Sequence, residues 1–271
     1  MKKVFMLLVV AMMLVGCGRE AGQAGAPGHI GPDAEAGAMH EHEAGAEYEG
    51  HYELYYNVYF NAAPVVRRPM VALTFDDGPS AYTDSILDLL ERYGGRATFF
   101  VTGRRISDRS DTVLRAFELG NEIANHTWSH PRLTSISDAE IIREIQYTSS
   151  AIAALTGVSH PMHRPPFGSS DERVARVSGS LGYSIVKWTV DPKDWRDRNP
   201  DIVYERIMSR AVDGAIILAH DIHPTTAQAM ERVIPRLVEE GFALVTVTEL
   251  LHYMHGGLEP GRTYGTNIIL D

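Results

Sequence analysis

The chain has 271 residues, of which 44% are hydrophobic, and its formal charge at neutral pH is −10. It is long enough to bury the core of one sizeable domain, and its composition excludes a fibrous or wholly disordered protein. An acidic chain without a basic cluster is a poor nucleic-acid binder. These limits predict one folded domain with an appendage and no nucleic-acid partner; no obligate protein partner is predicted either.

The N-terminus has the pattern of an export signal. Lys2 and Lys3 precede an apolar run over residues 4–15, which is too short to span a membrane as a helix. Cys17 follows, and because it is the only cysteine an internal disulfide is excluded. A lone cysteine after a small residue at a signal's end resembles the bacterial lipobox. We therefore predict a lipoprotein signal at 1–16 and a lipid anchor on Cys17, with an ordinary signal peptide as the alternative.

Either kind of signal exports the domain. Cleavage after residue 16 removes two lysines and no acids, so 23 basic and 35 acidic residues leave a charge of −12. Residues 17–50 are rich in Gly, Ala, Glu and His, cannot offset the entropy of ordering, and are predicted to form a flexible tether. Alternating apolar residues in the lead-in segment 51–68 predict one edge strand.

Residues 69–251 alternate short apolar runs with helical patterns, which is typical of an α/β domain with a mainly parallel sheet. Chemistry-bearing residues follow six of the runs rather than one switch point, which favours a distorted (β/α) barrel of about seven units. Residues 252–271 are predicted to be a surface extension. The predicted strands are 70–75, 97–101, 122–125, 162–164, 184–188, 215–219 and 243–247, and the clearest helices are 82–93, 138–155 and 227–240.

Two aspartates close the first predicted strand. Asp76 and Asp77 precede Gly78-Pro79. Adjacent side chains on a strand point to opposite faces, so both reach one site only where the strand breaks into a turn. A simple turn or a helix-capping pair is the alternative interpretation.

Two histidines follow the third predicted strand. His126 and His130 are four residues apart, so one helical turn would place both imidazoles on the same side. With a carboxylate they make a set that leaves coordination positions open for water and substrate, as catalytic zinc requires. The pattern predicts a divalent metal site, with zinc as first choice and cobalt or another divalent ion as alternatives.

Three later segments complete the candidate site. Arg164 opens a proline-stiffened stretch, and its guanidinium could orient a catalytic aspartate and lower its pKa. Asp191 and Asp194 precede Trp195. Leu218 and His220 share one strand face, so His220 lies at the end of that strand as a candidate proton donor. Thr102-Gly103 is left unassigned, and His160, His163 and His223 are expected to be solvent-exposed.

As an ordered set these segments resemble the polysaccharide deacetylases of carbohydrate esterase family 4, or NodB homology domains. The resemblance covers about residues 69–250 and implies a distorted (β/α) barrel. It implies the following roles: Asp76 as general base, Asp77, His126 and His130 as metal ligands, Arg164 beside the base, the Phe167 amide toward the oxyanion, Asp194 tuning the catalytic histidine, Trp195 walling the site, Leu218 in the acetyl pocket, and His220 as general acid. The family often has Tyr at Phe167 and Asn at Asp171; the first change should be tolerated.

The implied chemistry suits these residue types. An acetamide is a poor electrophile, so a divalent ion must polarise it and activate water while a carboxylate removes the proton and a histidine protonates the departing amine. A non-haem iron oxygenase would leave Asp76, Arg164 and His220 unused, and a glycosidase would not need the paired histidines. A catalytically silent binding lipoprotein should have lost some of these residues.

Substrate identity is less determined. Export and a lipid anchor would place the enzyme beside the cell wall, so N-acetylglucosamine in peptidoglycan is the favoured substrate. Chitin oligomers, exopolysaccharides and acetylated xylan remain open.

Overall fold

The structure is a computed structural model that describes residues 68–265. The predicted signal sequence, Cys17, the tether and all but the last residue of the lead-in segment lie outside the described residues.

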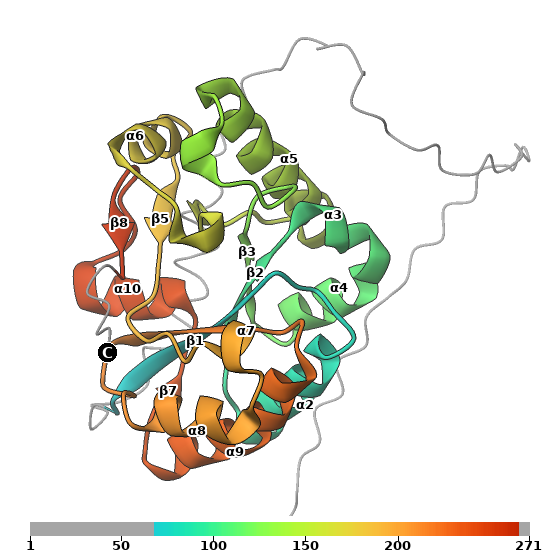
Figure 1. Ribbon diagram of the computed structural model, residues 1–271, viewed down its shortest axis with the longest axis vertical. Coiled ribbons are helices and arrows are strands. Elements are labelled where there is room, and N and C mark those ends of the chain that lie inside the picture. Colours follow the sequence, from blue (N-terminus) through green and yellow to red (C-terminus); the bar gives the residue numbers. More distant parts are fainter. Residues whose placement is uncertain (1–67, 266–271) are drawn as a thin grey trace, which may run out of the picture. The chain divides into compact units, whose positions relative to one another are not determined.

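The described part of the chain folds around one sheet of eight strands, and every strand pairing in it is parallel (Figure 1). The order is β6-β1-β2-β3-β4-β5-β8, with β7 paired to the start of β1. An isolated bridge between Val190 and Ile217 links the segment after β5 to β6. The strands are β1 Met70–Asp76, β2 Thr98–Val101, β3 Glu122–Asn125, β4 Met162–His163, β5 Ser184–Val186, β6 Ala215–His220, β7 Ala243–Leu244 and β8 Thr263–Tyr264.

Both faces of β1 are buried, which explains its almost continuous apolar sequence. Val71 and Leu73 face the core beneath the surrounding helices. Met70 and Ala72 belong to a second core inside the curled sheet. The period of two then puts Asp76 on the interior face, at the carboxyl end of the strand.

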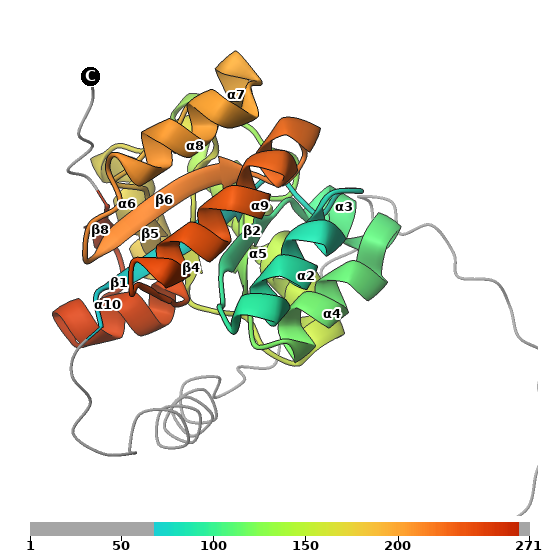
Figure 2. The same cartoon turned by 90° about the horizontal axis from the view of Figure 1, so that it is seen from below.

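Helices connect the strands and cover the outer face of the sheet. Local signals start and stop them: Ser137 and Glu140 form a capping box at α5, and Gly94 ends α2 in the left-handed conformation. α2, α8 and α9 lie side by side on the outer face (Figure 2). The helices are α2 Thr83–Tyr93, α3 Gly103–Ile106, α4 Ser110–Glu118, α5 Asp138–Thr156, α6 Glu172–Ser180, α7 Asp194–Asp197, α8 Pro200–Met208, α9 Pro224–Glu239 and α10 Val247–His255, with short 3₁₀ turns η1 Ser107–Arg109, η2 Leu133–Ser135 and η3 Pro166–Gly168.

The end of the domain differs from its prediction. Leu250 and Leu251 of α10 pack against the start of β1 and close the amino-terminal end of the interior. Beyond α10, Tyr264 on β8 is buried in the same core, and β8 pairs with β5. Within the predicted surface extension, β8 is therefore part of the sheet, while residues 252–263 are exposed or partly exposed. The Gly-rich and Pro-containing sequence of this stretch hid a two-residue strand whose stability comes from its partner.

The predicted α/β fold is confirmed. All seven predicted strands are present, in a parallel curled sheet with helices outside, as expected for a distorted (β/α) barrel. The largest error at a strand end is at β7, which stops at Leu244 because Thr246 caps α10 through a capping box with Glu249. The three clearest helices are also confirmed within a few residues.

Candidate active site

The candidate residues gather at the carboxyl ends of the strands. β1 ends at Asp76, whose register partner on β6 is His220. β3 leads directly into His126, and β4 leads into Arg164. Carboxyl ends of parallel strands meet at one rim, which is where barrel enzymes place their active sites. The sheet therefore brings together residues that are far apart in the sequence.

Asp77, His126 and His130 form one cluster of metal-binding side chains. The Oδ1 atom of Asp77 lies 3.3 Å from Nε2 of His126 and 3.1 Å from Nε2 of His130. The candidate ligand atoms all lie within 4.8 Å of one another. His126 is buried, whereas Asp77 and His130 are only partly buried, so the cluster has a solvent-facing side.

The protonation pattern of the cluster fits a cation. Nδ1 of His126 lies 2.7 Å from the carbonyl oxygen of Arg164, which places the ring proton there and leaves a lone pair on Nε2, toward Asp77. Oδ1 of Asp77 is buried but has no hydrogen bond within the described residues. An aspartate oxygen without a hydrogen bond and two neighbouring imidazole nitrogens are a donor set that fits a divalent metal ion.

The loop that carries the two histidines is not the helical turn predicted from their spacing. Thr127 and His130 have φ angles of 66° and 63°, in the left-handed region. The Thr127 amide donates to Oδ1 of Asn125 over 2.8 Å, and Glu144 of α5 accepts from the Ser129 amide and hydroxyl over 2.7 and 2.6 Å. Buried polar partners therefore shape this loop, and a spacing of four residues did not reveal them.

The strand-end break predicted at the aspartate pair is confirmed. β1 stops at Asp76, and Asp77 turns away with a φ of 72°, so both carboxylates reach the same rim. Thr102 secures this turn: its amide donates to the Gly78 carbonyl over 3.0 Å, and its hydroxyl donates to the Asp77 carbonyl over 2.9 Å. Thr102 follows β2 at the same rim, and this strand-end position is the sequence signal that indicates a role in the site.

Arg164 lies beside Asp76, as predicted. Its side chain is fully buried, and one Nη donates to Oδ1 of Asp76 over 2.7 Å. The remaining N–H groups donate to the Thr74 hydroxyl and to the carbonyls of Val186 and Lys187 over 2.7 to 3.1 Å. Burial lowers the pKa of Arg164, but the Asp76 carboxylate opposes this effect, so the guanidinium stays charged. The sequence had indicated the partner but not this network.

His220 and Asp194 form the second pair at the rim. Oδ1 of Asp194 lies 2.9 Å from Nδ1 of His220, and Oδ2 accepts the His220 amide over 2.8 Å and the Thr226 hydroxyl over 2.7 Å. Burial alone would lower the pKa of His220, but the hydrogen bond to Asp194 and its charge raise the pKa to about 9. His220 is therefore protonated at neutral pH, as a proton donor must be.

This pair predicts a specific pH dependence. Turnover that needs protonated His220 should fall as the pH rises through about 9. In Asp194→Asn the largest raising contribution is lost while burial remains, so the alkaline limb of kcat is expected to move to lower pH. A pH profile of kcat for both proteins measures the shift. An unchanged alkaline limb would remove Asp194 as the residue that tunes His220.

Three further candidates are located as follows. Phe167 has a φ of 60° and a ring that is 60% exposed, and the ring lies 4.8 Å from the His130 ring between centroids. Trp195 is 47% exposed on α7, directly after the buried Asp194. Leu218 is buried two residues before His220, on the same strand face. Their roles toward a substrate remain predictions.

The expectation of solvent exposure was wrong for two other histidines. His163 is fully buried, its Nε2 contacts the Ser178 hydroxyl at 2.8 Å, and burial lowers its pKa to about 3. His223 is also buried, and His160 is partly buried beside Glu122 at 3.2 Å. Single polar residues near strand ends do not reveal their burial, because the covering helices come from elsewhere in the chain.

Asp171, where the family often has Asn, caps α6. Its side chain accepts the Val174 amide over 2.8 Å at the helix N-terminus. Asp and Asn are comparable as N-caps, so this position performs one structural task in either form.

Comparisons with known proteins point to one protein family. The sequence model of the polysaccharide deacetylase family matches residues 64–186. The peptidoglycan-N-acetylmuramic acid deacetylase PdaC of Bacillus subtilis is 42% identical over 182 residues, which are 67% of this chain and 38% of that protein. A peptidoglycan-N-acetylglucosamine deacetylase of Bacillus cereus is 34% identical over 193 residues, which are 69% of this chain and 90% of that protein. The match therefore spans well under half of the first relative but most of the second.

The comparison of folds points to the same relatives as the comparison of sequences. The solved structure of PdaC from Bacillus subtilis is 40% identical and superimposes with a TM-score of 0.67, covering 70% of this chain and 93% of that chain. Sequence and fold thus agree over the same part of the molecule. The chain belongs to the polysaccharide deacetylase family, carbohydrate esterase family 4.

Proposed function

We propose that this chain is a metal-dependent hydrolase that removes N-acetyl groups from an envelope polysaccharide and releases acetate. The observation that carries the proposal is the position of the Asp77, His126 and His130 cluster at one rim with two hydrogen-bonded pairs, Asp76 with Arg164 and Asp194 with His220. A hydrolytic amidase needs a base for water and an acid for the leaving nitrogen, and the two pairs supply them.

The cluster would hold the metal ion through Asp77, His126 and His130. Zinc is the first choice, since two imidazoles and one carboxylate with open positions are typical of catalytic zinc, and cobalt or another divalent ion is the alternative. When bound, the cation polarises the acetamide carbonyl and lowers the pKa of water. The family consists of metal-dependent hydrolases, which supports this assignment.

Asp76 is the proposed base. Arg164 occupies its Oδ1, while its Oδ2 lies 3.7 Å from Nε2 of His126 and therefore borders the cluster. Asp76 would take a proton from the water that adds to the carbonyl carbon. The amide of Phe167 is proposed to donate to the oxyanion that forms on the former carbonyl oxygen.

His220 is the proposed acid. Asp194 occupies Nδ1, so Nε2 remains to protonate the leaving nitrogen as the carbon–nitrogen bond breaks. The products are acetate and an amine on the polymer. Leu218 is proposed to contact the acetyl methyl group and Trp195 to wall the site, consistent with their places beside His220 and Asp194.

The favoured substrate is N-acetylglucosamine in peptidoglycan. The names of the matching Bacillus proteins support a peptidoglycan substrate, although one of them acts on N-acetylmuramic acid. Chitin oligomers, exopolysaccharides and, as an esterase reaction, acetylated xylan are the alternatives, because sugar specificity depends on surface loops.

Metal dependence and substrate are tested together. The full chain stripped of metal is expected to release no acetate from peptidoglycan, and zinc or cobalt should restore release. Chitin oligomers and acetylated xylan, assayed in parallel, would show a different polymer preference. Stoichiometric metal binding with no acetate from any of these polymers would favour a catalytically silent envelope-binding lipoprotein instead.

We also propose export and lipid anchoring. Residues 1–16 would be the signal peptide, Cys17 the lipidated residue, and 17–50 the tether that connects the anchor to the lead-in segment and the catalytic domain. Within residues 68–265, no helix has the length and apolar character needed to cross a membrane. Mass spectrometry of the mature N-terminus tests the anchor, and an unmodified Cys17 would exclude it.

A further inference from the structure

Asp221 is a buried carboxyl group next to the site that the proposed mechanism does not use. It follows His220 at the end of β6, and only 1% of the residue is exposed. Its surroundings include Gly78 and Ser80 in the turn between β1 and α2, which begins directly after Asp76 with Asp77. Asp221 therefore joins the residue next to the proposed acid to the segment next to the proposed base and ligand.

Two hydrogen bonds connect Asp221 to that turn and to the first residue of α2, and a third joins those two partners. Its Oδ2 accepts the Thr83 hydroxyl over 2.5 Å, and its carbonyl accepts the Ser80 hydroxyl over 2.5 Å. The Thr83 hydroxyl in turn accepts the Ser80 amide over 2.8 Å. Both ends of the contact are fixed, because Thr83 is the first residue of α2 and Asp221 directly follows β6.

The turn also packs directly on the carboxyl group. A Cβ atom added to Gly78 would lie 2.3 and 2.4 Å from the two carboxyl oxygens of Asp221. No side chain fits there, so only glycine lets the backbone after Asp77 approach this closely. The position of the Asp77 backbone thus depends on the group behind Gly78.

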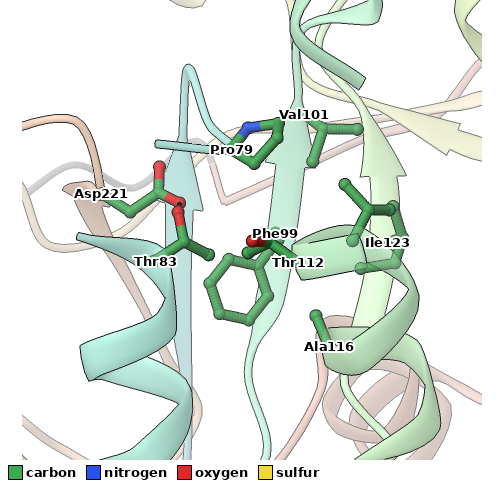
Figure 3. Close-up of a pocket in the computed structure, with 9 residues that line it drawn as sticks. Pro79, Thr83, Phe99, Val101, Thr112, Ala116, Ile123 and Asp221 are labelled. Atoms are coloured by element: carbon green, nitrogen blue, oxygen red, sulfur yellow. Dashed lines mark hydrogen bonds between the residues drawn. The ribbon is translucent and has the colours of Figure 1, made fainter. Parts of the chain in front are cut away.

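A small cavity of about 10 Å³ borders the same carboxyl group, and none of the three cluster residues lines it. Figure 3 shows the Asp221 carboxyl directed at the Thr83 hydroxyl beside Pro79, with the apolar side chains of Phe99, Val101 and Ile123 around the cavity. Oδ1 of Asp221 has no hydrogen bond within the described residues. Burial raises the pKa of Asp221 to about 7.

We propose that Asp221 is a positioning residue for the deacetylation: it ties the end of β6, which carries His220, to the turn that carries Asp76 and Asp77, and so sets the separation of acid, base and metal ligand. This inference rests on the proposed function. Ordinary core packing would require only a side chain of suitable size, whereas a hydrogen-bonded connection requires an oxygen that accepts from the Thr83 hydroxyl.

The test compares four variants of the full chain. Asp221→Asn keeps the shape and an acceptor oxygen, Asp221→Ala removes both, and Thr83→Val removes the donor. Thr112→Val is the matched control, because Thr112 lines the same cavity but donates to Asp84 on α2 rather than to the turn. The readouts are zinc affinity by chelator competition, the absorption spectrum of the cobalt-loaded protein, and separate kcat and KM values.

Asp221→Ala is expected to lower kcat and zinc affinity by about 10-fold to 100-fold and to change the cobalt spectrum, as losses of groups behind metal ligands do. Thr83→Val should shift them in the same direction. Asp221→Asn and Thr112→Val should keep the wild-type spectrum and nearly the wild-type kcat. If Asp221→Ala fails to fold, Thr83→Val decides.

Two results would overturn the proposal. One is a wild-type cobalt spectrum and kcat in both Asp221→Ala and Thr83→Val. The other is an Asp221→Asn variant as impaired as Asp221→Ala, which would indicate a role for charge. The metal readouts need no substrate. Failure of the proposed function, seen as no hydrolysis by wild-type protein, is therefore distinguishable from failure of this inference.

Discussion

Replacing Asp76 with Asn is expected to lower kcat by about 100-fold to 10,000-fold while the protein still binds its metal ion. An amide does not take a proton from water. It does retain an oxygen that can accept the 2.7 Å hydrogen bond from Arg164, so the buried guanidinium keeps a partner. Acetate release and zinc content, measured on the same preparation, check both halves of the prediction.

Asp171→Asn is the matched control for this substitution. The same change of atoms occurs at a helix cap outside the cluster, where Asn is as good a cap as Asp, so kcat should stay at the wild-type value. Normal turnover in Asp76→Asn would remove Asp76 as the base. Loss of metal together with turnover would instead place Asp76 among the ligands.

Replacing His126 with Ala is expected to abolish metal binding and activity together. Losing a partner behind a metal ligand already weakens metal affinity by about 10-fold to 100-fold, so removing a ligand should weaken it by more than about 100-fold. Nε2 of His126 lies 3.3 Å from Oδ1 of Asp77, and among residues 68–265 the cluster holds no imidazole other than those of His126 and His130. Zinc affinity by chelator competition gives the measurement.

His163→Ala controls for the cavity that the His126 substitution leaves. His163 is as buried as His126 and is the last residue of the neighbouring strand β4, but it is not part of the metal cluster. The control variant should unfold at a lower temperature and still bind zinc with wild-type affinity. Equal losses of zinc in both variants would mean that packing, rather than ligation, accounts for the effect of His126→Ala.

Patterns of short range in the sequence predicted the strands and the main helices. β1 and β6 are recognisable because strands buried on both faces need continuous apolar runs. The strand-end position of Asp76, Asp77 and His220 followed from the same runs, and their meeting followed from the rule that parallel strands end at one rim. The very short strands were harder, and β8 was missed entirely because two residues carry no pattern of their own.

The shape of the site depended on contacts between distant segments. The histidine loop was predicted as a helical turn, but Asn125 and Glu144 fold it otherwise. Thr102 and Asp221 contact the aspartate turn from two other strand ends, and a strand-end position alone does not specify these hydrogen bonds. Hydrogen bonds of this kind are specified by side chains that no local pattern links.

The sequence by itself therefore determined the residue types of the site, their order along the chain, and the parallel α/β frame, because periodicity and strand-end placement are local properties. Only the tertiary structure decided which histidines are buried, how the backbone turns at Asp77 and His130, and which nitrogen of His126 faces the cluster. Those features are set by packing and by long-range hydrogen bonds, which form only when the sheet has brought its strand ends together.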